Sequence, residues 1–253
     1  MNNNNFPLVV CLATPERKAN YQWFEGSIAL KDPNIKIETL EDLQNRGCTT
    51  PVDAKTNDLL ILHPYEQNKY IHIEDVESAI IKASKFFKYK EILQELGALS
   101  YNVVSGNMRI YKAETDINVD GKAFFKTPVE SKVDVKNKED FFSKMGFGLK
   151  ATFDGVRTVS EESYNNAWSL IEKYRLQDDE CIVSLVRARN PHIENHQRTE
   201  HLRYEAMQEF NKCVDVAVAF NVAKVFDLSA KIKHAISEKV DYSLEIDVAF
   251  PEQ

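Results

Sequence analysis

The stretch from Arg109 to Val135 constrains the fold of this chain more than any other segment. From Ala123 to Val135 every second residue is apolar or small and most of the others are charged, which is the period-two pattern of a strand with one wet face. The preceding Asp120-Gly121 pair supplies the positive φ angles that a tight hairpin turn needs. The run from Arg109 to Val119 alternates with the same parity, less regularly. The pattern predicts a long β-hairpin that needs an apolar cover on one face.

Composition indicates a folded globular chain and argues against a nucleic-acid partner. The 253 residues are 43% hydrophobic and 10% aromatic, which is enough to bury a core. The formal net charge is −7 and basic residues are not gathered in one half. The sequence therefore lacks the basic cluster that binding to a phosphate backbone requires. Four scattered cysteines predict reduced thiols in a cytoplasmic protein. No segment has the apolar length expected of a membrane span.

Residues 1–105 predict an α/β-type unit with the element order βαββαβ. Phe6–Ala13 and Asp58–His63 are apolar runs bounded by polar residues, as expected of strands buried on both faces. An apolar stripe over Glu74–Leu96, followed by Gly97, predicts a helix with a glycine at its end. A ferredoxin-like layer and half of a doubly wound sheet both fit this order, and periodicity does not separate them.

Residues 106–253 predict a hairpin-rich antiparallel sheet packed by helices. A helix is predicted from Ser160 to Tyr174, with the serine as its N-cap. The segment Tyr242–Phe250 alternates most cleanly, and we expect it to pair inside the main sheet. Cys181–Arg189 is predicted as a strand and Asn195–Lys212 as a polar helix. The overall prediction is an α+β fold.

Several segments of the second half are predicted with less local support. Val214–Val222 satisfies both the helical and the strand period, so both alternatives stand. Helices are expected at Lys138–Met145 and over residues 226–240. The seam between the two units falls in Asn102–Met108, where an unbroken strand pattern makes one continuous domain an equal alternative to two.

The ends of the two buried strands carry one group of candidate catalytic residues. If the first sheet is parallel, these ends meet at one edge, where ligands bind in open α/β sheets. Glu16 and Arg17 follow the first strand, and His63, Tyr65 and Glu66 follow the second. Together they predict an acid–base or anion-binding cluster. The alternative is that they are ordinary strand-terminal loop residues.

A second candidate group is the histidine cluster of His192, His196 and His201. The first two are one helical turn apart, the spacing at which both rings reach one metal ion if the segment is helical. However, Ile193 stands where the zinc-protease pattern needs a glutamate. We therefore expect solvated histidines and no bound metal. Glycine-rich phosphate loops and a Gly-x-Ser-x-Gly elbow are absent from the sequence, so no cofactor is predicted.

Two classes of function remain. The first is a non-enzymatic interaction or self-assembly module whose partner is a protein or a second copy, with membrane contact through amphipathic hairpins as a narrower version. The second is a hydrolase-like cytosolic enzyme using the strand-end group near His63. The first is preferred because catalytic side chains do not converge in the sequence, whereas amphipathic strands abound. The spatial neighbours of His63 and His196 discriminate: polar groups in a concave pocket favour an enzyme, and isolated rings favour a binding module.

Overall fold

A mixed four-stranded sheet forms the N-terminal part of the protein. The computed structural model describes residues 6–23, 33–112, 115–117, 123–125, 129–134, 150–193, 199–222 and 240–251. The sheet has the order β2-β1-β3-β4 and contains β1 (Val9–Leu12), β2 (Ile35–Glu38), β3 (Leu59–Leu62) and β4 (Tyr70–His72). β1 pairs in parallel with β2 and antiparallel with β3. All residues of β1 and β3 are buried, as their apolar runs predict.

The helices of this part give the predicted element order. They are α1 (Pro15–Trp23), α2 (Leu40–Asn45), the 3₁₀-helix η2 (Ile73–Glu77) and α3 (Ala79–Glu95). The order agrees with a βαββαβ-like unit to which α2 and β4 are added. The sheet differs from both alternatives considered for it, because it is not parallel and because the strand that follows α3 pairs in the other sheet.

The glycine predicted to end the long helix is required there. Gly97 has a φ of +72°, in the left-handed region that favours glycine. A Cβ at this position would lie 2.8 Å from the carbonyl oxygen of Val156. The helix therefore stops where a side chain would collide with the neighbouring loop.

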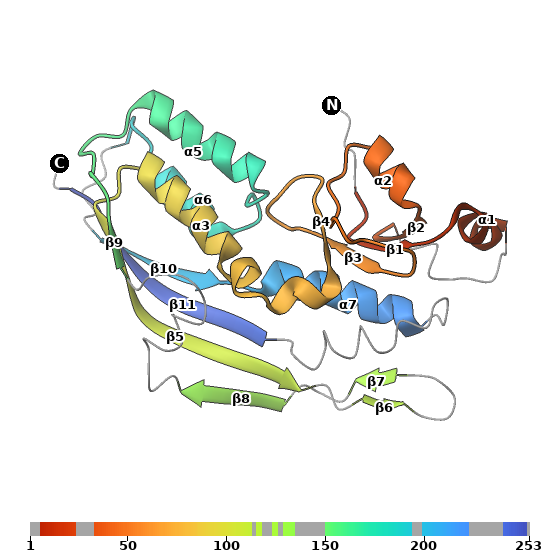
Figure 1. Ribbon diagram of the computed structural model, residues 1–253. Coiled ribbons are helices and arrows are strands. Elements are labelled where there is room, and N and C mark those ends of the chain that lie inside the picture. The colour runs from red at the N-terminus through yellow and green to blue at the C-terminus, as the bar shows by residue number, and fades with distance from the viewer. Residues whose placement is uncertain are drawn as a thin grey trace.

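The second sheet is antiparallel and has β11 in its interior, as predicted. Its order is β10-β11-β5-β8, with β10 (Thr199–Glu205), β11 (Val240–Ala249), β5 (Ser100–Lys112) and β8 (Val129–Asp134), and β9 (Lys150–Thr152) pairs with the start of β5. Helices α3, α5 (Glu161–Lys173) and α6 (Glu180–Ala188) lie over one face of this sheet (Figure 1). The Ser160 side chain accepts a hydrogen bond from the Ser163 amide, which confirms the predicted N-cap of α5.

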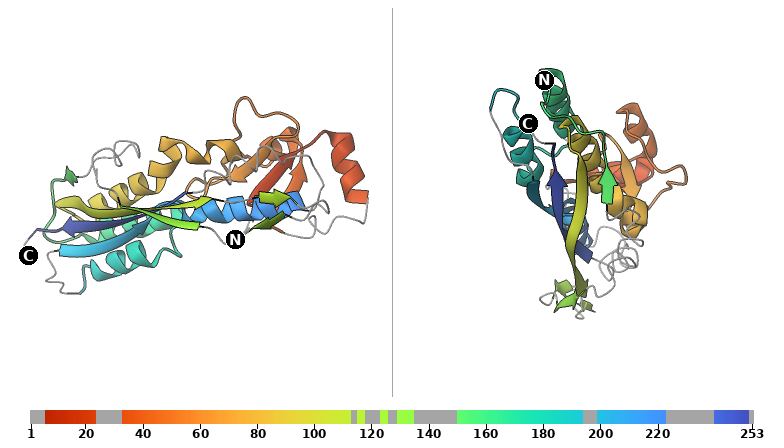
Figure 2. Two further views of the ribbon diagram at one scale, coloured as in Figure 1. Left: turned by 90° about the horizontal axis from the view of Figure 1, so that it is seen from below. Right: turned by 90° about the vertical axis from the view of Figure 1, so that its left-hand side faces the viewer.

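The mid-chain hairpin is present, with a register that corrects the predicted parity. β5 pairs antiparallel with β8, and the pairs Arg109–Lys132 and Lys112–Val129 are symmetric about residues 120 and 121, where the turn was predicted. The turn itself lies outside the described residues. Tyr111 is opposite Glu130 and not on the apolar side of the hairpin, because the register of β5 with β8 pairs odd-numbered with even-numbered positions. Beyond β5 and β8, the pair β6 (Thr115–Ile117) and β7 (Ala123–Phe125) lies far from α5 (Figure 2).

Two secondary-structure predictions in the second half are wrong. Residues 180–188 form α6 and not a strand, because the buried residues Ile182, Val183, Leu185 and Val186 follow the helical period and Asp179 caps the Ile182 amide. Residues 199–205 form β10 and not part of a helix, since Leu202 and Tyr204 alternate with more exposed residues. Val214–Val222, left open between helix and strand, belongs to α7 (Gln208–Val222). The helix predicted at 138–145 lies outside the described residues. The helix predicted over 226–240 also does, except for Val240, which is the first residue of β11.

One hydrophobic cluster joins both halves of the chain. It contains residues of β1 and β3 together with residues of β5, β10 and β11. Helix α7, from the C-terminal half, contacts β1, β2 and β3 of the N-terminal sheet (Figure 1). β5 is continuous through residue 105. The four cysteines are free, and Cys11, Cys48 and Cys213 are buried.

Candidate functional site

A buried lysine binds two carboxylates and one carbonyl oxygen, which come from three other elements, where the two sheets meet. Lys85 lies on α3 and its side chain is 2% exposed. Its Nζ is 2.8 Å from Oδ2 of Asp179, the residue that caps α6, and 3.0 Å from Oε1 of Glu209 in the first turn of α7. The third hydrogen bond, of 2.9 Å, goes to the carbonyl oxygen of Glu205 at the end of β10. The three N–H groups of the ammonium thus have three acceptors.

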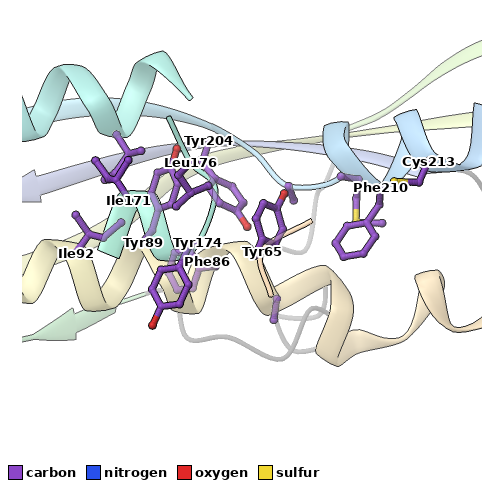
Figure 3. Packing of buried hydrophobic residues seen from close by; sticks show 14 of the residues in the cluster. Tyr65, Phe86, Tyr89, Ile92, Ile171, Tyr174, Leu176, Tyr204, Phe210 and Cys213 are labelled. Atoms are coloured by element: carbon purple, nitrogen blue, oxygen red, sulfur yellow. The ribbon is translucent and has the colours of Figure 1, made fainter. Parts of the chain in front are cut away.

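A tyrosine connects this group to the N-terminal sheet. The Tyr65 hydroxyl donates a hydrogen bond to Oε2 of Glu209, the oxygen that does not bind Lys85. Tyr65 follows β3 and is buried. Its ring lies between those of Tyr204 and Phe210 (Figure 3), with a centroid distance of 5.8 Å to Phe210. We call Tyr65, Lys85, Asp179 and Glu209 the lysine network.

The electrostatics of the lysine network keep the lysine charged and the tyrosine neutral. Burial opposes the charge of Lys85, but Glu209 and Asp179 outweigh it and the pKa of Lys85 is raised. Burial, followed by the charge of Glu209, raises the pKa of Tyr65 well above its ordinary value. A protonated lysine has no lone pair to act as a nucleophile or a base. The lysine network therefore has the properties of a buried set of ion pairs and hydrogen bonds that stabilises the packing of several elements.

A charged cleft of about 630 Å³ opens beside the lysine network. Its basic lining residues are Lys85, Arg175, Arg203 and Lys212, and its acidic ones are Asp178, Asp179, Glu180, Glu205 and Glu209. Ligand pockets are usually lined mainly by apolar side chains with a few polar groups. Both signs of charge surround this cleft, so any ligand that fits it is a small, strongly polar molecule.

The structure separates the strand-end candidates into two groups. Because β1 and β3 are antiparallel, their carboxyl ends point to opposite ends of the sheet. The parallel arrangement that would bring the two ends together is not present. Glu16 and Arg17 start α1, where Arg17 Nη1 donates a hydrogen bond of 2.7 Å to Asn57. His63, Tyr65 and Glu66 lie at the opposite end of the strands, after β3. Of these three residues only Tyr65 belongs to the lysine network.

His63 is held in a buried, neutral form. Its ring is 1% exposed and lies 5.4 Å, between centroids, from that of Phe210. Nδ1 accepts a hydrogen bond of 3.2 Å from the Tyr65 amide, and Nε2 is 3.5 Å from Oε1 of Glu66. Burial lowers the pKa of His63 to about 4, although the Glu66 carboxylate opposes the shift. These contacts position the loop after β3.

The buried histidine predicts a pH-dependent stability. Between pH 6.5 and pH 4 the unfolded chain binds a proton at His63 that the folded chain excludes. The free energy of unfolding should therefore fall as the pH falls through this window, by roughly 3 kcal/mol in total. Urea unfolding of the wild type and of His63→Asn, whose amide oxygen can replace Nδ1 as the acceptor, measures this contribution. The slope should be smaller in His63→Asn and unchanged in His192→Asn; equal slopes in all three proteins would contradict the assignment.

The histidine cluster is not assembled around one point in the described residues. His201 lies on β10, with Nδ1 2.5 Å from Oδ1 of Asp247 on the paired strand β11. His192 is exposed in the turn after α6, and His196 lies outside the described residues. Among the described residues no group of three or more His, Cys, Asp or Glu side chains could hold a metal ion.

We expect chelation to leave the protein unchanged. A metal held only by the folded chain would add its binding free energy to stability, so its removal would lower the melting temperature. EDTA should cause no shift, and elemental analysis should find sub-stoichiometric zinc. One tightly held metal ion per chain would contradict this expectation.

The sequence reasoning missed three members of the lysine network. Lys85 is one helical turn before the buried Tyr89 and two turns before Ile92, so it interrupts the buried stripe of α3. A lysine in an apolar stripe is a signal that a buried carboxylate partner is needed. Asp179 and Glu209 gave no comparable local signal, because their roles depend on chain segments that meet only in the fold.

Comparison of the chain with protein families, with curated protein sequences and with solved structures found no match. Among the described residues, no helix is both long enough and apolar enough to cross a membrane.

Proposed function

We propose that this protein acts by binding a polypeptide strand along β8, as a cytoplasmic interaction or self-assembly module. The observation that carries the proposal is the position of β8 at the edge of the second sheet, where β5 is its strand neighbour on one side. An edge strand presents N–H and C=O groups that can pair with an added strand. In the described part of the chain no strand pairs with the other side of β8.

The lysine network supports this proposal because its polar atoms are already used within the fold. Lys85 has three acceptors, and the two carboxylate oxygens of Glu209 bind Lys85 and Tyr65. Asp179 also caps α6. A group whose hydrogen-bonding capacity is filled by its neighbours stabilises the fold and leaves little for a substrate. Stabilisation of the fold thus explains why polar side chains gather near Tyr65, and no catalytic role is needed.

The charged cleft favours a second candidate function, an enzyme or receptor for a small polar molecule. Arg175 and Lys212 line this cleft and make no ion pair within the described residues, so they are its available cations. The test is a thermal-shift screen with small phosphates, dicarboxylates and amino acids. A ligand that raises the melting temperature of the wild type but not of Lys212→Ala would support this candidate, and no shift with any compound would remove it.

Hydrogen–deuterium exchange tests the β8 proposal directly. Amides that face outward from an edge strand exchange quickly until a partner strand protects them. We expect deuterium uptake over residues 129–134 to fall at high protein concentration or on addition of an extract of the source cells. Residues 199–205 of β10, the other edge, are the internal control.

The same exchange measurement distinguishes binding of a polypeptide strand from the membrane version of this function. Vesicles of anionic and of neutral lipid are added in parallel, with dye leakage as a second readout. Protection of residues 129–134 only with vesicles, accompanied by leakage, would transfer the function to membranes. No protection under any of these conditions would overturn the proposed function.

A further inference from the structure

We infer that the strand bound by β8 is β8 of a second copy of this chain, paired antiparallel about a two-fold axis through Ser131. The inference rests on the proposed function and names its partner. Symmetric dimers use the same surface on both subunits, so the partner of an edge strand in such a dimer is that same strand. The choice of residue on the axis then fixes every opposed pair.

The sequence of β8 is self-complementary in this register. β8 reads Val-Glu-Ser-Lys-Val-Asp from Val129 to Asp134. With Ser131 on the axis, Glu130 is opposite Lys132 of the partner subunit, and this pair occurs twice. Val129 is opposite Val133 of the partner subunit, also twice. Opposite charges and paired β-branched residues are both favourable at directly opposed positions.

The registers centred on the two residues next to Ser131 lose this complementarity. An axis through Lys132 places the two Lys132 residues opposite each other and Glu130 opposite an aspartate. An axis through Glu130 opposes the two glutamates. Of the registers centred on Glu130, Ser131 and Lys132, only the one centred on Ser131 places Glu130 opposite Lys132 and Val129 opposite Val133.

The residues that lie side by side on β11, β5 and β8 support the same register. Asp241 of β11 is opposite Arg109 of β5, and Arg109 is opposite Lys132 of β8. Two basic residues are therefore adjacent at the outer end of the row, which is unfavourable in the single chain. Glu130 of the partner subunit would follow Lys132 in the dimer. Each basic residue of the row then has an acidic neighbour.

Charge reversal tests the inference with the intact chain. Glu130→Lys and Lys132→Glu each replace two attractive pairs of the dimer by two repulsive ones, and each should raise the dimer dissociation constant roughly tenfold. An equimolar mixture of the two variants should form a heterodimer with the wild-type constant. The double variant should recover the homodimer. Lys112→Glu, on β5 of the same hairpin, is the control and should behave as the wild type.

Sedimentation equilibrium gives these constants, and circular dichroism shows that each variant is folded. A wild type that stays monomeric at every concentration would overturn the second copy as partner. Dimers unaffected by either reversal, or not recovered in the mixture, would overturn the register. Protection of β8 by cell extract, together with either result, would leave the proposed function standing. Absence of any protection over residues 129–134 would refute both.

Discussion

Deleting residues 241–253 should give a protein that is insoluble or lacks cooperative unfolding. β11 pairs with β10 on one side and with β5 on the other, so the deletion removes the hydrogen-bond partner of both. It also removes Leu244, Ile246 and Val248, whose side chains are at most 2% exposed. Each fully buried side chain of this size contributes about 1.5–3 kcal/mol, whereas a folded domain is typically stable by only about 5–15 kcal/mol.

Circular dichroism and urea unfolding of the truncated chain provide the measurement. Deletion of Met1–Asn5, which lie outside the described residues, is the control and should change nothing measurable. A soluble truncated chain that unfolds cooperatively would show that β11 is a detachable segment. Self-association through the pairing positions it leaves on β5 would then replace β8 pairing as the leading interpretation.

Replacing Lys85 by methionine should lower the free energy of unfolding by about 3 kcal/mol at neutral pH. The change leaves Asp179 and Glu209 without the cation that they share, and also frees an acceptor at Glu205. Removal of one partner from a buried ion pair is costly because the remaining charges are uncompensated. Lys90→Met, at an exposed position of the same helix, should cost little.

The pH dependence and a compensating variant test the cause of this loss. The difference between wild type and Lys85→Met should shrink at low pH, where carboxyl groups are protonated and no longer need the cation. Adding Asp179→Asn and Glu209→Gln to Lys85→Met should recover part of the stability at neutral pH. A loss that is independent of pH and is not recovered would indicate a packing defect and not an unpaired charge.

The fold was predictable from the sequence wherever a segment contains both a clear hydrophobic period and the residues that begin or end the element. The helix after Ser160 has a cap, acidic first-turn residues and an apolar stripe, and β11 alternates over its whole length. Residues 180–188 were mistaken for a strand because their valines and isoleucine favour strands, while Asp179 and the packing of the helix decide otherwise. The mixed pairing of β1 depends on contacts between distant segments, which no local pattern encodes.

The candidate site was predictable only in part for the same reason. Tyr65 was identified from its position at the end of a buried strand, but its partner Glu209 is 144 residues away in the sequence. Lys85 and Glu209 are 124 residues apart. Within the apolar stripe predicted over Glu74–Leu96, Phe86 is buried, whereas its neighbour Phe87 is 44% exposed. An error of one position on a helix turns a side chain by about 100°, which moves it from the core to solvent.

Sedimentation velocity of edge-blocked variants tests whether the protein associates through β8. Successive amides of a strand face opposite sides, so one of the Ser131 and Lys132 amides faces away from β5. Proline there removes that donor and blocks strand addition. We predict concentration-dependent association of the wild type and a folded, monomeric protein for at least one of Ser131→Pro and Lys132→Pro. Association of both variants to the same extent as the wild type would contradict association through β8.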